Sequence, residues 1–80
     1  MTINILAFGI AKEILGAASR QIVLGSEIDV TSLKSVLQKQ YPRLSGLTSF
    51  AIAVNGEYAR EDKLIRPGDE IAIIPPVSGG

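Results

Sequence analysis

An amphipathic segment at residues 29–41 constrains the fold most, because it is the longest helical pattern in a chain of short β-prone runs. Apolar residues recur along it at helical spacing and form one stripe: Val30, Leu33, Val36, Leu37 and Tyr41. Asp29 is a typical N-cap, and Pro42 ends the helix because the residue before a proline avoids the helical region. Lys34, Gln38 and Lys39 lie off the stripe and are expected on a solvated face.

Short β-prone runs lie on both sides of this helix. They predict strands at residues 2–8, 21–24, 50–54, 57–59 and 71–74. Asn55-Gly56 is the strongest hairpin signal in the sequence and joins the third and fourth of these strands. Residues 43–49 are expected to form a connector, and Leu64 and Ile65 to tuck beneath the sheet.

A short helical segment follows the first strand. Gly9 breaks the strand pattern, and Ile10 and Ile14 then stand one helical turn apart. Gly16 is a typical residue at a helix end. One or two turns of helix are therefore predicted at residues 10–15.

The order of these elements predicts the fold. Two strands, one main helix and two or three further strands are typical of an α+β protein of the β-grasp type. We expect a mixed sheet of four to five strands that wraps the helix, with the first and last strands parallel and side by side. Eighty residues allow one small domain. The expected division is a β-grasp domain at 1–74 and a flexible, extended C-terminal tail at 75–80.

One face of such a sheet would be left without a helix. Its candidate apolar residues are Leu6, Phe8 and Ile74, which makes this face a candidate partner interface. Phe8, at the strand exit, is either a core aromatic or an interface anchor. Lys12 is either a solvated charge or a docking contact.

Composition excludes several classes of function. Apolar residues make up 46% of the chain, more than so small a domain can hide, and the formal net charge is zero. That balance indicates neither nucleic-acid nor membrane binding. Without cysteine or histidine, the chain offers no thiol nucleophile, imidazole base or usual zinc site. We therefore expect no metal site, no cofactor-binding site and no catalysis by this chain alone. In the absence of a signal-peptide pattern, the expected location is cytoplasmic.

The last residues of the chain carry its most specific functional signal. Pro75 and Pro76 forbid helix and favour an extended backbone, and Val77 and Ser78 lead to Gly79 and Gly80. Two glycines without Cβ atoms allow a narrow channel to enclose the terminal carboxylate. These six residues predict a thread whose reactive group is the Gly80 carboxylate.

The sequence resembles the small, ubiquitin-like subunits of molybdopterin synthase. The resemblance covers nearly the whole chain and is carried by residues 8–16, 54–59, Leu64 and 67–80. Its most specific part is G-D-E-I-A-I-I-P-P-V-S-G-G, at residues 68–80. Lys12 stands where that family often has arginine, and Ile74 where some members carry an aromatic residue.

The resemblance implies that the chain is a sulfur carrier in molybdenum cofactor biosynthesis. An ATP-dependent, E1-like activating enzyme would adenylate Gly80, and a sulfur donor protein would convert the adenylate to a thiocarboxylate. The tail, residues 75–79 with Gly80, would then enter the large subunit of a heterotetrameric synthase and pass sulfur to a cyclic pterin phosphate. Phe8, Lys12 and Ile74 would contact that partner. No cofactor would stay bound, since the activating enzyme uses the ATP.

Three alternatives remain open from the sequence. A sulfur carrier for thiazole synthesis would share the fold and the Gly-Gly end, although such carriers are typically shorter. A ubiquitin-like protein modifier would join Gly80 to a lysine of its target. A plain interaction domain with an inert tail would function normally without Gly79 and Gly80.

Overall fold

A computed structural model describes residues 1–47 and 50–75 of the chain. Its elements follow in the order β1 (Thr2–Ala7), α1 (Gly9–Leu15), β2 (Ser19–Val23), β3 (Ile28–Asp29), α2 (Val30–Gln40), the 3₁₀ helix η1 (Pro42–Gly46), β4 (Ala51–Val54), β5 (Glu57–Tyr58), β6 (Leu64–Ile65) and β7 (Glu70–Ile74). In the described ranges, none of the helices has the length and apolar character needed to cross a membrane.

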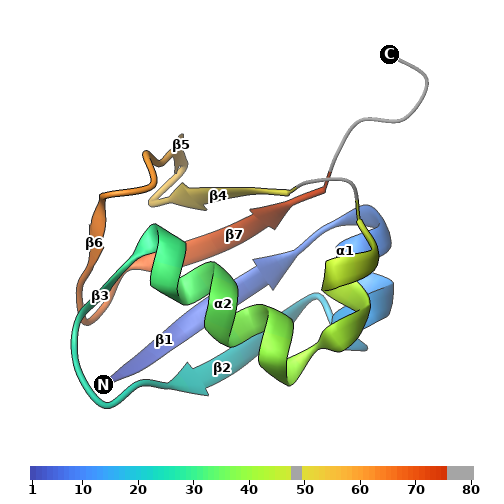
Figure 1. The fold of residues 1–80 in the computed structure, drawn as a ribbon, viewed down its shortest axis with the longest axis horizontal. Coiled ribbons are helices and arrows are strands. Elements are labelled where there is room, and N and C mark those ends of the chain that lie inside the picture. The colour runs from blue at the N-terminus through green and yellow to red at the C-terminus, as the bar shows by residue number, and fades with distance from the viewer. Residues whose placement is uncertain (48–49, 76–80) are drawn as a thin grey trace.

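Five strands form one mixed sheet in the order β2-β1-β7-β4-β5 (Figure 1). The terminal strands β1 and β7 pair in parallel, and every other pair in this sheet is antiparallel. The main helix α2 lies across one face of the sheet (Figure 1). This arrangement confirms the predicted α+β fold of the β-grasp type, including the adjacent parallel terminal strands.

The core lies between the sheet and α2. Alternate residues of β1 and β7 point toward α2 and pack against its apolar stripe. The residues of these three elements that are at most 1% exposed are Ile3, Ile5, Ile71, Ile73, Val30, Leu33 and Leu37. Ile52 of β4 and Ile65 of β6 extend this core and are equally buried. The apolar residues that alternate along the strands and those that form the helical stripe thus pack together in one core.

The loop before β6 holds the first turn of α2. Asp29 Oδ1 accepts the Ser32 N–H at 2.8 Å, as predicted for an N-cap. The N–H groups of Val30 and Thr31 donate to the carbonyls of Lys63 and Glu61 at 3.0 and 3.1 Å. Together these contacts satisfy three of the N–H groups that a helix start leaves unpaired.

Lys34 departs from the prediction of a solvated helix face. Its side chain is only 25% exposed, and Nζ lies 2.8 Å from Glu61 Oε1. The same ammonium lies 5.6 Å from the centre of the Phe50 ring. The prediction was wrong for Lys34 because residues 60–63 fold back over this side of α2, which the helical pattern alone does not reveal.

The Asn55-Gly56 hairpin is confirmed. Asn55 and Gly56 adopt φ angles of 53° and 86°, the two positive values that the favoured two-residue hairpin turn requires. Gly68, at φ 87°, supports a second turn, in which the Asp69 N–H donates to the Arg66 carbonyl at 3.1 Å. Both turns lie at the same end of the sheet. The first turn follows the end of β4, the second precedes the start of β7, and these two strands are antiparallel neighbours.

Several local predictions need correction. The second strand begins at Ser19, two residues earlier than predicted. β3 and β6 form a separate two-stranded ribbon that was not predicted, in which Ile65 is buried while Leu64 is 48% exposed. The connector after α2 contains η1, which buries Leu44 completely. Two-residue strands and single buried residues are set by tertiary contacts, so no local sequence pattern identifies them.

Candidate functional site

The central strand β7 delivers the end of the chain to one corner of the sheet. Ile73 pairs with Ala7, so β7 ends beside the exit of β1, where Phe8 and Gly9 begin α1 (Figure 1). A Cβ atom placed on Gly9 would lie 3.7 Å from Cγ of Pro75. Of the predicted tail, Pro75 is thus placed against Gly9, while Pro76, Val77, Ser78, Gly79 and Gly80 lie outside the described residues.

The short helix α1 frames this corner. Its first residue, Gly9, has a φ of 55°, and the Ala11 N–H donates to the Phe8 carbonyl at 3.0 Å. Gly16 ends the helix in the left-handed conformation at φ 78°, as predicted. The buried side of α1 consists of Ala11 and Leu15.

Two predicted interface residues are exposed at this corner. The side chain of Phe8 is 52% exposed, so its interpretation as a core aromatic is wrong. Phe8 leaves β1 as the N-cap residue of α1, which carries its ring past the edge of the core. Lys12 is exposed on α1. A role for either residue in partner binding stays a prediction.

The sheet face opposite α2 is apolar across its middle. Leu6 pairs with Ala72, Ala72 with Ala53, and Ala53 with Tyr58, so these four side chains form one row across β1, β7, β4 and β5. Alanines occupy the centre of the row, which makes it shallow, and Tyr58 at its edge is 75% exposed. We call this surface, with the half-buried Ile74 beside Pro75, the open face.

A shallow hollow of about 440 Å³ adjoins the corner. Its lining consists of Gly9, Lys12, Glu13, Gly16 and Ala17. Three of these residues are small, and the other two carry opposite charges. Because a Cβ added to Gly9 would lie within contact distance of Pro75, the hollow lies close to the point where the described chain ends.

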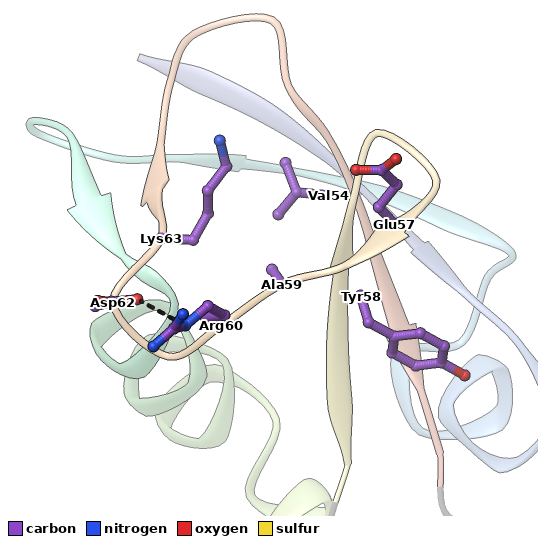
Figure 2. A pocket seen from close by; sticks show the side chains of 7 residues that line it. All are labelled: Val54, Glu57, Tyr58, Ala59, Arg60, Asp62 and Lys63. Carbon is purple, nitrogen blue, oxygen red and sulfur yellow. Dashed lines mark ion pairs between the residues drawn. The ribbon is translucent and has the colours of Figure 1, made fainter.

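A second hollow, of about 300 Å³, lies at the far end of the sheet. Figure 2 shows it between the β4–β5 hairpin and the loop that follows; its lining is Val54, Glu57, Tyr58, Ala59, Arg60, Asp62 and Lys63. Arg60 and Asp62 form an ion pair of 3.8 Å, with side chains 90% and 84% exposed, so the pair is weak. Val54 pairs with Ile71, whereas Ala51 pairs with Ile74, which places this hollow away from Pro75.

Three carboxyl groups have perturbed acidity. The Ser32 N–H lowers the pKa of Asp29, and the Lys34 ammonium, followed by the Thr31 hydroxyl, lowers the pKa of Glu61. The Arg66 N–H, followed by the Asn55 amide, lowers the pKa of Asp69. A lowered pKa makes a carboxylate a poor proton donor at neutral pH. The hydrogen bonds that lower these pKa values hold the start of α2 and the turn before β7 in place, so we assign the three groups a structural role.

Metal binding has no support in residues 1–47 and 50–75, where no three acidic side chains gather closely enough to hold an ion. The described site offers a corner of the sheet with an exposed aromatic ring, an exposed cation and an apolar face, from which the last five residues of the chain continue.

Comparison with known proteins gives consistent matches over the whole chain. The ThiS family profile matches residues 5–80. The human molybdopterin synthase sulfur carrier subunit is 38% identical over 82 residues, which cover 98% of this chain and 93% of the human one. A chain of the complex between subunits 1 and 2 of the molybdopterin-converting factor from Helicobacter pylori is 27% identical, with a TM-score of 0.68 and full coverage of both chains.

A solved structure with lower sequence identity supports the fold alone. The chain described as a putative molybdopterin converting factor, subunit 1, from Pyrococcus furiosus gives a TM-score of 0.86 at 22% identity. The match covers 96% of this chain and 99% of the other. The whole described architecture is therefore that of known β-grasp chains.

Proposed function

This chain belongs to the ThiS family, and on that premise we propose that it is the sulfur-carrier subunit of a molybdopterin synthase. The observation that carries the proposal is the match to the human sulfur carrier subunit at 38% identity over 98% of this chain. The ThiS family profile extends to residue 80, so the range that it matches includes the closing Gly79-Gly80.

The proposed chemistry takes place at the Gly80 carboxylate. A carboxylate is a poor electrophile, so one of its oxygens first attacks the α-phosphorus of ATP and expels pyrophosphate. The terminal sulfur of a persulfide on the donor protein then adds to the carbonyl carbon of the acyl adenylate, and AMP leaves with the bridging oxygen. A second thiol cleaves the S–S bond of the acyl disulfide, which frees the thiocarboxylate and leaves the donor as a disulfide. The resulting thiocarboxylate is a softer nucleophile than the carboxylate, and its sulfur is delivered to a pterin precursor.

Partners would supply the catalytic groups. An E1-like activating enzyme binds and cleaves the ATP, a sulfur donor protein provides the sulfur, and the large synthase subunit holds the pterin in a heterotetramer. This chain then acts as a carrier with no enzymatic activity of its own. We assign these steps to the cytoplasm.

The geometry of the described residues supports this division of labour. Pro75 follows β7, the central strand of the sheet, which pairs with β1 on one side and β4 on the other. The tail therefore begins at a strand that is hydrogen-bonded along both edges. Five further residues have a maximum reach of about 17 Å, enough to carry Gly80 into a partner's active site. Phe8, Lys12 and Ile74 surround the point of departure and would form the contact surface for the large subunit.

Reconstitution with a shortened chain tests the proposal. The full chain and a variant lacking Gly79 and Gly80 are each incubated with activating enzyme, ATP, sulfur donor, large subunit and pterin precursor. Only the full chain should yield the sulfurated pterin, because the variant ends at Ser78, whose side chain is too large for a channel shaped to glycine. Equal product from both chains would instead indicate an interaction domain with an inert tail.

A further inference from the structure

The side chain of Asn55 clamps the hairpin turn to β7. Asn55 Nδ2 donates to Asp69 Oδ1 at 3.0 Å, and Asn55 Oδ1 accepts the Glu70 N–H at 3.0 Å. Asp69 is held in turn, because its Oδ2 accepts the Arg66 N–H at 2.9 Å. Both polar atoms of the Asn55 carboxamide are therefore engaged. We call these two contacts of the carboxamide the Asn55 clamp.

Asn55 is also followed by a glycine, which gives the turn a chemical liability. The Gly56 nitrogen has no neighbouring side chain to shield it, so it can lose its proton and add to Asn55 Cγ. The C–Nδ2 bond then breaks, and the nitrogen takes up a proton and leaves as ammonia. Water opens the resulting five-membered succinimide at either carbonyl, which yields aspartate or isoaspartate.

The Asn55 clamp opposes this reaction. Ring closure makes Cγ tetrahedral, which moves Oδ1 and Nδ2 away from Glu70 and Asp69 together. The departing nitrogen also needs a proton, and the Asp69 carboxylate, which is ionised at neutral pH as an ordinary aspartate is, has none to give. The Arg66 N–H, followed by the Asn55 amide, lowers its pKa further. We propose that Asn55 is a deamidation site that its contact with Asp69 suppresses in the folded chain.

The reaction product would undo the turn. An aspartate at position 55 would place a second carboxylate against Asp69, at the position from which Nδ2 now donates. An isoaspartate would add a backbone carbon to a turn that depends on the φ angles of 53° and 86°. Either product would weaken the short β5 strand and the wall of the hollow in Figure 2. The corner at Pro75 lies at the other end of β7, so this inference stands apart from sulfur transfer.

Mass spectrometry of the aged full chain tests the proposal. Wild type, Asp69→Ala and Glu61→Ala are incubated at neutral pH below their thermal midpoints, and peptide mapping separates asparagine, aspartate and isoaspartate at position 55. Glu61→Ala is the matched control, because it removes the Lys34 ion pair and the Thr31 hydrogen bond without touching the Asn55 clamp. We expect Asp69→Ala to deamidate about tenfold faster than wild type, since a hydrogen bond to a charged group is lost. Glu61→Ala should keep the wild-type rate.

Two further measurements keep the proposal falsifiable if Asp69→Ala does not fold. Asp69→Asn has one side-chain oxygen where Asp69 uses two, for Asn55 Nδ2 and for the Arg66 N–H, and it carries no charge, so it should deamidate at a rate between those of wild type and Asp69→Ala. Wild type unfolded in urea should deamidate at least about tenfold faster than folded wild type, because the clamp is absent. Equal rates in folded and unfolded wild type, or equal acceleration by Asp69→Ala and Glu61→Ala, would overturn the proposal.

Discussion

Gly9 lies against Pro75, with 3.7 Å between the position of a Cβ on Gly9 and Cγ of Pro75. The contact joins residues that are far apart in the sequence but adjacent at one corner of the sheet. Gly9 begins α1, and Pro75 is the last described residue after β7. The base of the tail therefore lies next to the helix that carries Lys12.

Gly9→Ala should lower the free energy of unfolding by about 1 kcal/mol, because its φ of 55° is unfavourable for a residue with a Cβ. A clash is not the reason, since 3.7 Å is an ordinary contact distance. Gly9→Asn is the matched variant, because asparagine tolerates this conformation better, and it should lose less. Urea unfolding measures the free energy of unfolding of both variants. An equal decrease in the two would show that the space around the added Cβ, and not the backbone conformation, determines the cost of the substitution.

Phe8→Asp should abolish binding to the large synthase subunit while changing the thermal midpoint little. The ring is 52% exposed, so the substitution removes apolar contact area for the partner more than it removes core packing. A pull-down and a thermal melt on the same samples check the two effects.

Val23→Asp is the control for Phe8→Asp. Val23 is 79% exposed and pairs with Thr2, at the opposite end of β1 from Phe8. It should leave binding unchanged. If both substitutions weaken binding alike, charge on the sheet in general is responsible, and Phe8 loses its assignment to the interface.

Stability should fall as the pH drops below about 4.5, through the ordinary range of carboxyl groups. Asp29, Glu61 and Asp69 all have lowered pKa values in the folded chain. The unfolded chain therefore binds protons first as the pH falls, and their contribution, present at neutral pH, is lost. Urea midpoints measured between about pH 6 and pH 3 should decline accordingly.

Asp29→Asn isolates one of these groups. Asparagine is also a good N-cap, so the helix start is kept while one titrating group is removed. The variant should have nearly the wild-type midpoint at neutral pH and a shallower decline in acid. An unchanged acid decline would mean that Asp29 does not contribute to it.

Gly79→Val should block sulfur loading without altering the melting temperature. A β-branched side chain restricts the backbone and adds bulk where a narrow enzyme channel would have to enclose the tail. The variant of choice for comparison is Ser78→Ala, which removes a hydroxyl and adds no bulk. Product formation by Gly79→Val at the wild-type rate would contradict the requirement for a side-chain-free end.

Local periodic patterns and one turn signal in the sequence predicted most of the fold. The stripe on α2, the alternation in β1 and β7 and the Asn55-Gly56 turn each depend on local conformation, which is why they could be recognised without the structure. The β3–β6 ribbon could not, because two residues per strand carry no period. Leu44 was missed for a similar reason, since a single buried residue in a connector has no repeat to reveal it.

The candidate site was predictable only in part. Phe8, Lys12 and Ile74 could be named from the sequence, but the exposure of Phe8 depends on how β1 turns into α1. The contact between Gly9 and Pro75 depends on the parallel register of β1 and β7, which no local pattern encodes. A glycine directly after the first strand was the one available signal. The loop packing that half-buries Lys34 left no signal in the helical pattern.

The mass of the intact chain after incubation with ATP, an activating enzyme and a sulfur donor tests the central claim most directly. A sulfur carrier should gain the mass difference between sulfur and oxygen, and fragmentation should place that gain on Gly80. Omitting ATP should abolish it, because the carboxylate must be adenylated first. An unchanged mass in the complete mixture, with a known carrier loaded in parallel, would contradict the account.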